Sequence, residues 1–255
     1  MEASGRVVVV TGGGSGIGAA LCRAFAAGGA RAVVVADVNG DAAAAVGVEV
    51  GGDAVSTDVT READVVELVR RTVDAHGRID IYCSNAGIAV GGGMEAADED
   101  WQRSWNVHVM AHVYAARAVI PAMVDRGEGC FLGTASAAAL LNHIASAPYA
   151  ATKAATLSVL EWLAITYGPR GVQVAALCPQ GVKTPMLAAA GERDFLADGA
   201  LEPQAVAGAV LEGLRDERFL ILPHPEVREY FARKASDYDR WLRGMQRLRD
   251  HVLPG

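Results

Sequence analysis

The chain has 255 residues, of which 51% are hydrophobic and 21% are charged, a composition typical of a soluble globular protein. Its formal net charge is -7, and this acidic balance gives no reason to expect binding to nucleic acid or to an anionic membrane surface. Because we find no signal peptide, no continuous apolar span of about 20 residues and no CxxC pair, we expect a cytoplasmic protein without a metal site.

Short apolar runs alternate with longer segments of helical pattern along the chain. The runs, each a predicted strand, cover residues 7–10, 32–36, 54–57, 79–84, 130–135, 172–177 and 219–222. The predicted helices include residues 16–27, 61–75, 98–125, 149–167 and 203–215. Strands that are apolar at nearly every position are covered on both faces, and strand–helix alternation builds βαβ units. We therefore expect one α/β domain, residues 1–255, with a Rossmann-like, doubly wound parallel sheet of about seven strands and helices on both faces.

Two late segments depart from this alternation. Residues 186–202 are mixed in character, poorly periodic and placed just after the sixth predicted strand, so we expect them to form a lid over a substrate. Residues 224–255 carry aromatic and aliphatic side chains among many charges. This spacing predicts a helical tail whose apolar face needs a surface to pack on.

A glycine-rich turn follows the first predicted strand and opens a helix. Thr11, Gly12, Gly16 and Gly18 fit a TGxxxGxG spacing. Glycines at such a turn let backbone amides approach a phosphate, and the helix N-terminus favours a pyrophosphate. Asp37 lies 37 − 18 = 19 residues after Gly18, where a carboxylate accepts hydrogen bonds from the adenosine ribose and repels the 2′-phosphate of NADP. The pattern predicts NAD as the cofactor.

Tyr149 and Lys153 stand one helical turn apart in a predicted helix, so their side chains share a face. A tyrosine has a pKa of about 10, and lowering it to near 7 takes about 4 kcal/mol. A lysine ammonium about 5 Å away supplies about 3 kcal/mol at an effective dielectric of about 20, and an oxidised nicotinamide ring nearby could supply the remainder. The pair can therefore do acid/base work that a tyrosine alone cannot, although the same spacing also arises by chance on an exposed helix.

Several motifs in order resemble the single-domain short-chain dehydrogenase/reductase family. The resemblance runs from Arg6 to about Leu222 and rests on residues 11–18, Asp58, Asn85-Ala86-Gly87, Asn106, Ser136, Tyr149 with Lys153, and Pro179 to Thr184. It implies a doubly wound sheet with the nicotinamide cofactor across the strand ends. It also implies a homodimer or homotetramer, and an alcohol or ketone as the substrate.

The resemblance also implies roles for individual residues. Ser136 would hydrogen-bond the substrate oxygen and Tyr149 would transfer the proton. Lys153 would bind the nicotinamide ribose and lower the tyrosine pKa, and Asn106 would hold a water that links Lys153 to solvent, unless it is an ordinary helix-surface amide. Asp58 would contact the adenine, although aspartate is also a common helix cap. The residues expected at the cofactor are Gly12, Ser15, Gly16, Ile17, Gly18, Asp37, Val38, Asp58, Val59, Asn85, Ala86, Gly87, Tyr149, Lys153, Pro179, Gly181, Val182 and Thr184.

The sequence departs from the family's usual Pro-Gly after the sixth strand, because Gln180 stands between Pro179 and Gly181. This places a side chain near the expected nicotinamide site and bears on loop geometry and substrate choice. Apolar residues nearby, including Leu141, Phe195 and Leu196, favour a hydrophobic secondary alcohol or ketone. The residues expected at the substrate are Ser136, Leu140, His143, Tyr149, Gln180, Met186 and Leu187.

Other interpretations remain open from the sequence. A cofactor-sensing regulator without turnover would need only the nucleotide half of the site. A lyase or dehalogenase on the same fold would be expected to lack the glycine-rich turn. His108 and His112 have a spacing that can bind zinc, but no third ligand is evident, which favours a structural role. His143 could equally be a solvated loop residue.

Overall fold

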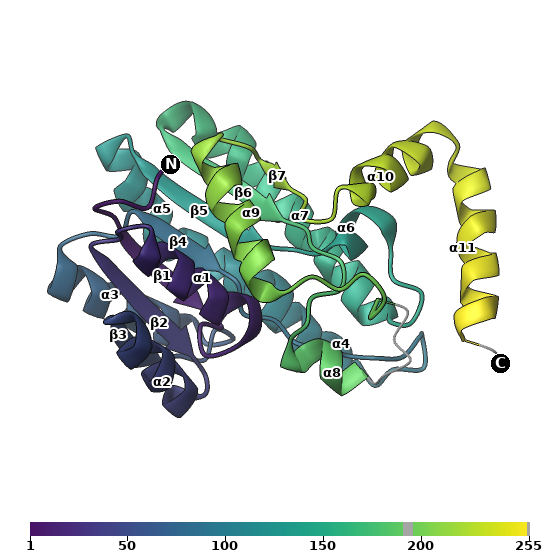
Figure 1. Ribbon diagram of the computed structural model, residues 1–255, viewed down its shortest axis with the longest axis horizontal. Helices are drawn as coiled ribbons and strands as arrows, with labels where there is room; N and C mark the ends of the chain where they lie inside the picture. The colour runs from purple at the N-terminus through teal and green to yellow at the C-terminus, as the bar shows by residue number, and fades with distance from the viewer. Residues whose placement is uncertain (191–195, 254–255) are drawn as a thin grey trace.

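The computed structural model describes residues 1–190 and 196–253, and its strands form one parallel sheet (Figure 1). The strands are β1 (Val7–Thr11), β2 (Ala32–Asp37), β3 (Asp53–Ser56), β4 (Ile81–Ser84), β5 (Gly129–Thr134), β6 (Val172–Leu177) and β7 (Leu220–Ile221). Their order is β3-β2-β1-β4-β5-β6-β7, and every pairing is parallel. The strand order reverses between β1 and β4, so a crevice for a ligand is expected at their carboxyl ends. The predicted fold class is confirmed.

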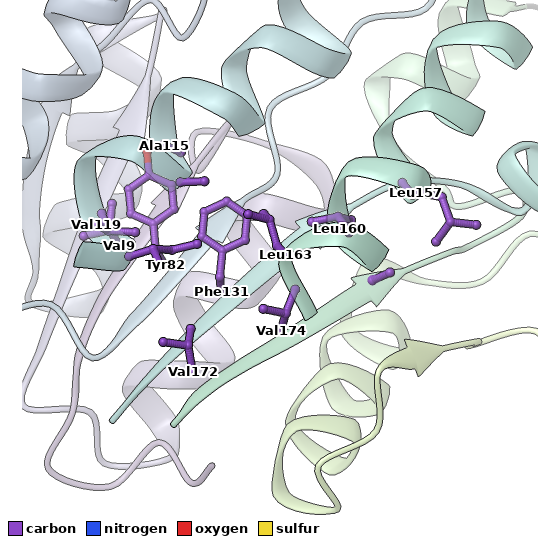
Figure 2. Packing of buried hydrophobic residues seen from close by; sticks show 14 of the residues in the cluster. Val9, Tyr82, Ala115, Val119, Phe131, Leu157, Leu160, Leu163, Val172 and Val174 are labelled. Atoms are coloured by element: carbon purple, nitrogen blue, oxygen red, sulfur yellow. The ribbon is translucent and has the colours of Figure 1, made fainter. Parts of the chain in front are cut away.

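Helices cover both faces of the sheet because the buried strands present alternate side chains to each side. One layer consists of α1 (Gly16–Ala27), α2 (Gly40–Val50) and α9 (Pro203–Arg215). The other consists of α3 (Glu62–His76), α5 (Ala111–Arg126) and α7 (Ala147–Tyr167). On the face of the sheet that this second layer covers, Tyr82 of β4 stacks on Phe131 of β5 with ring centroids 5.9 Å apart (Figure 2). The cysteines Cys22, Cys83, Cys130 and Cys178 are buried free thiols.

The segment predicted as one helix over residues 98–125 is broken by a π-turn. It consists of α4 (Asp98–Trp105), a π-helical turn (Asn106–Met110) and α5. The whole stretch Asp98–Arg126 is long and apolar enough to cross a membrane, but 56% of its apolar window is buried. Ala115, Val119 and Met123 belong to the core on the sheet. The stretch is therefore a core helix of the fold.

Short helices and the chain's end surround the carboxyl edge of the sheet. They are α6 (Ala137–Leu141), α8 (Pro185–Ala190), α10 (Glu226–Ser236) and α11 (Tyr238–Val252). Helix α10 packs on α6, whereas α11 packs chiefly on α10 and lies outside the main body (Figure 1). Of the segment expected to form a lid, residues 191–195 lie outside the described residues, and so does the predicted pocket residue Phe195.

Candidate active site

A cavity of about 1530 Å³ runs along the carboxyl edge of the sheet. It begins beside the ends of β2 and β3, crosses the glycine-rich turn after β1, and continues between α7, α8 and α11. Every residue predicted at the cofactor lines this cavity. The nucleotide half and the catalytic half of the site are therefore one continuous space.

The glycine-rich turn forms a cradle with no room for side chains. Gly12 and Gly16 have φ angles of 65° and 49°, which L-residues with side chains rarely adopt. A β-carbon on Gly18 would lie 2.0 Å from the carbonyl oxygen of Gly12, and one on Gly16 would lie 2.9 Å from Cγ2 of Thr184. The turn thus keeps backbone exposed at the start of α1, where a pyrophosphate fits.

Asp37 at the end of β2 fits the adenosine ribose of NAD. One carboxylate oxygen accepts a hydrogen bond from the Gly14 N–H at 3.0 Å and the other accepts one from the Asn39 N–H at 3.0 Å. The basic residues among the described lining are Lys153, Arg233, Arg240 and Arg247, which belong to α7, α10 and α11. No described cation at the adenosine end would pair with the 2′-phosphate of NADP, so the residues fit NAD(H).

We expect Asp37→Asn to weaken NADH binding and improve NADPH binding, each by about tenfold. The amide keeps the shape of the side chain but removes the charge that repels a phosphate. Titration of cofactor fluorescence measures both dissociation constants. Asp58→Asn is the matched control, because Asp58 lines the same end of the cavity and accepts hydrogen bonds from Thr60. An NADH/NADPH ratio that changes equally in both variants would contradict the role of Asp37.

Ser136, Tyr149 and Lys153 meet on one wall of the cavity. Ser136 follows β5 and caps α6, its hydroxyl accepting the N–H of Ala138 at 3.1 Å. Ser146 caps α7 by accepting the N–H of Tyr149 at 3.1 Å, which starts the helix two residues before the predicted position. Lys153 is buried, donates to the carbonyl of Thr134 at 2.9 Å and lies 5.7 Å from the centroid of the Tyr149 ring.

The acid/base properties of this wall differ from the expectation for Tyr149. Burial raises the pKa of Tyr149, and hydrogen bonding to Ser136 offsets this only in part. Burial also lowers the pKa of Lys153 to about 8, which weakens the lysine as a source of positive charge. Among the protein's own groups, burial therefore penalises the phenolate more than its neighbours stabilise it, and the expected lowering of the tyrosine pKa would need the added positive charge of an oxidised nicotinamide. The neutral phenol is suited to donate a proton.

Two histidines flank the tyrosine ring edge-on. The ring centroids of His108 and His143 lie 5.3 Å and 5.6 Å from that of Tyr149. His108 is fully buried, and its ring nitrogens contact Oγ1 of Thr152 at 2.8 Å and the carbonyl of Ile88 at 3.0 Å. His108 thus joins α7 to the loop after β4. No group that could hold a metal ion is found among the described residues.

The buried histidines predict a loss of stability in mild acid. Burial, followed by repulsion from Lys153, lowers the pKa of His108 to about 2 and that of His112 to about 3. An unfolded histidine titrates near pH 6.5, so below that pH the unfolded state binds protons that the native state does not. Each histidine should therefore cost about 2 kcal/mol of unfolding free energy between pH 6.5 and about pH 5. Urea denaturation at both pH values measures this loss.

His112→Leu removes one of the two groups and should flatten the pH dependence by about 2 kcal/mol. The change is feasible because neither ring nitrogen of His112 has a hydrogen-bond partner in the described part of the protein. His251→Gln, at an exposed position on α11, is the control and should leave the pH dependence as it is. An unchanged pH slope in His112→Leu would contradict the assignment.

Asn85 ties three strands together beneath the cofactor site, as expected for a supporting residue. Its side-chain amide donates to the carbonyl of Thr11, and its side-chain oxygen accepts from the Thr134 hydroxyl, both at 3.0 Å. Asn106 is placed differently. Its side-chain oxygen accepts from Gln102 at 2.9 Å on the outer side of the helix, and it does not line the cavity. The structure therefore does not bring the Asn106 side chain to Lys153, and a role in proton transfer stays a prediction.

The residues predicted at the substrate line the cavity with one exception. Leu140 is buried against α7 and α10, so the prediction for it is wrong, and Leu141 lines the cavity in its place. The reason is geometric, since neighbouring residues of a short helix point about 100° apart. The remaining predicted residues in the lining are Ser136, His143, Tyr149, Gln180, Met186 and Leu187.

The loop that contains Gln180 is held by a histidine that the sequence did not point to. His224 follows β7 and is buried. Its Nδ1 accepts the Gln180 N–H at 3.2 Å and its Nε2 lies 3.1 Å from the carbonyl of Gly181. This pattern fits a neutral ring that donates from Nε2, and burial lowers its pKa. In the sequence His224 lies 44 positions after Gln180 and 43 positions after Gly181, so no local motif reveals these contacts.

Comparison with known proteins agrees with this geometry. A model of the short chain dehydrogenase family matches residues 6–194. The chain is 38% identical over 238 residues to 1-deoxy-11-beta-hydroxypentalenate dehydrogenase of Streptomyces exfoliatus, covering 89% of this chain and 86% of that protein. It is 37% identical over 207 residues to 2,5-dichloro-2,5-cyclohexadiene-1,4-diol dehydrogenase of Sphingobium indicum, covering 79% and 81%.

A solved short chain dehydrogenase/reductase from Burkholderia phymatum, in complex with NAD, superposes with a TM-score of 0.86. The two chains share 29% sequence identity, and the match covers 94% of this chain and 96% of that one. The superposition agrees with the observed strand order, and the family match spans the glycine cradle and the Ser136, Tyr149 and Lys153 wall. The chain belongs to the short-chain dehydrogenase/reductase family, and its nucleotide pocket is that of an NAD(H)-dependent dehydrogenase.

Proposed function

We propose that this enzyme interconverts a hydrophobic secondary alcohol and its ketone with NAD(H), with Tyr149 as the acid/base. The observation that carries the proposal is the wall formed by Ser136, Tyr149 and Lys153, which opens into the same cavity as the glycine cradle. Apolar side chains of Leu141, Met186 and Leu187 line the adjoining part of that cavity. Such a lining favours a substrate with an apolar skeleton.

The protein's own groups supply orientation and the proton. The hydroxyls of Ser136 and Tyr149 are placed to bind the substrate oxygen, and the neutral phenol protonates that oxygen as a ketone is reduced. The cofactor, when bound, supplies or accepts the hydride at the carbon. Oxidation of an alcohol requires the phenolate, and buried Tyr149 forms it only with added positive charge nearby. Lys153, anchored on the Thr134 carbonyl, is the protein's own source of such charge.

The named relatives support the reaction class. Both are called dehydrogenases of compounds that carry hydroxyl groups on larger skeletons. A set of cyclic and open-chain secondary alcohols of graded polarity, offered with NAD, tests the proposal by the formation of NADH. Turnover that improves with apolar size supports it. Turnover of small polar alcohols alone would contradict the hydrophobic substrate, and NADH binding without any turnover would favour a regulator.

We also propose that the protein works in the cytoplasm as a homodimer or homotetramer. On α7, Trp162 and Ile165 are 58% and 77% exposed, and on α4 Trp105 is 44% exposed. Large apolar side chains on an outer helical face suit a second copy of the chain. Light scattering of the wild type and of Trp162→Glu tests this. A wild-type protein that is monomeric at micromolar concentration would contradict the proposal.

A further inference from the structure

The outer wall of the cavity is formed by one face of α11. The residues of this outer wall are Arg240, Trp241, Gly244, Met245, Arg247 and Leu248. Trp241, Met245 and Leu248 are spaced to form an apolar stripe along the helix. Arg240 and Arg247 are seven residues apart, which places them two turns apart beside that stripe. The outer wall thus presents apolar surface bordered by two guanidinium groups.

Within the described residues, the side chains of Arg240 and Arg247 have no charged partner. Neither forms an ion pair or a side-chain hydrogen bond with any residue in the described ranges 1–190 and 196–253. Some surface arginines are paired, such as Arg70 with Glu67 and Asp74, and Arg233 of the cavity lining pairs with Glu229. What distinguishes Arg240 and Arg247 from Arg243 on the same helix is that both line the cavity.

The described carboxylates that line this part of the cavity, Asp198, Glu226 and Asp237, form no ion pair with the outer wall. Asp237 precedes α11 and accepts the backbone N–H of Arg240 at 2.9 Å, so it serves as the helix cap. Glu226 lies in the first turn of α10, close enough to His224 to raise that residue's pKa slightly against burial. Asp198 also lines the cavity, but forms no ion pair with either arginine. The positive charge of the outer wall therefore faces the space that a substrate enters.

Resting on the function proposed above, we propose that the substrate carries an anionic group, which Arg240 and Arg247 bind while its apolar skeleton extends toward Tyr149. A guanidinium binds a carboxylate or a phosphate through paired N–H donors. The apolar stripe between the arginines would cover the adjoining part of the skeleton. Both residues are exposed, so a bound anion would replace water at their guanidinium groups, whereas a neutral substrate would gain nothing from them.

The test compares methyl-ketone fatty acids of increasing chain length with their methyl esters, using NADH as the reductant. At the chain length that spans from Tyr149 to the outer wall, the acid should have a kcat/KM about tenfold above that of its ester, as one charge-assisted contact provides. The difference should lie in KM, and it should shrink as salt is raised. The same ketones ending in a phosphate monoester show which of the two anions is preferred.

The double variant R240Q/R247Q should bring the acid/ester ratio close to one and leave the kcat for the esters unchanged. The control is R243Q, because Arg243 is on the same helix but does not line the cavity. A ratio near one in the wild type at every chain length would overturn the inference while the esters still report the proposed activity. An acid preference that survives in R240Q/R247Q would overturn it as well.

Binding separates this inference from a failure of the proposed function. If no ketone is reduced, calorimetric titration of the same acids and esters into the NADH complex shows whether the anion site exists. Acids that bind about tenfold more tightly than esters, in the wild type only, support the anion site. Equal binding overturns it. A change in oligomeric state of R240Q/R247Q with an unchanged acid/ester ratio would overturn it too, and would assign the outer wall to a contact between two copies of the chain.

Discussion

Replacing Tyr149 by phenylalanine is expected to lower kcat/KM by about 10³-fold or more, with NADH affinity nearly unchanged. The phenylalanine ring fills the same space between His108 and His143, so the wall keeps its shape. Only the hydroxyl that binds and protonates the substrate oxygen is lost. The loss of its hydrogen bond with Ser136 costs about 1 kcal/mol of stability, which leaves the fold intact.

NADH fluorescence titration and steady-state rates on the best alcohol measure the two effects separately. Tyr167→Phe is the matched control, since it makes the same change at the other end of α7, where Tyr167 stacks edge-on with Trp162 rather than facing the cavity. Its rates should equal those of the wild type. Undiminished turnover in Tyr149→Phe would remove the basis of the proposed mechanism.

Gly18→Ala is expected to abolish measurable NADH binding and to destabilise the fold by about 3 kcal/mol or more. The new β-carbon would lie 2.0 Å from the carbonyl oxygen of Gly12 and 2.8 Å from the side-chain amide of Asn85. Backbone at the end of β1 cannot yield as a flexible side chain can. The turn must open, and the amides that approach the pyrophosphate move with it.

Thermal unfolding and NADH titration measure the consequences of Gly18→Ala. Gly208→Ala is the control, because Gly208 is exposed within α9 and a β-carbon there meets nothing within 4 Å. That change should stabilise the protein by up to about 1 kcal/mol, as alanine does in a helix. If Gly18→Ala bound NADH as well as Gly208→Ala does, the close packing of the cradle would not be what forms the cofactor site.

The sheet and the cofactor cradle could be predicted from the sequence because their signals are local. Buried parallel strands are apolar at almost every position, and a glycine-rich turn must follow the strand that feeds it. Tyr149 and Lys153 are likewise separated by one helical turn. Each of these patterns needs only a few consecutive residues, so their placement in the structure matches the prediction.

What could not be predicted depends on contacts between distant segments. His224 reaches the Gln180 loop, and α11 supplies Arg240 and Arg247 to the cavity, through packing that has no local signature. The raised pKa of Tyr149 in the protein alone could not be predicted for a related reason. The spacing of Lys153 from Tyr149 predicts an attraction between ammonium and phenolate. The larger effect of burial depends on all the distant segments that pack around Tyr149.

His224 lies after all seven strands in the sequence, yet it fixes the loop beside the catalytic wall. Its ring contacts the peptide groups of Gln180 and Gly181, which follow β6. A truncation that removed His224 and the helices after it would keep every strand and the glycine cradle in the chain but would remove these two contacts. The order of this loop therefore depends on the C-terminal part of the fold.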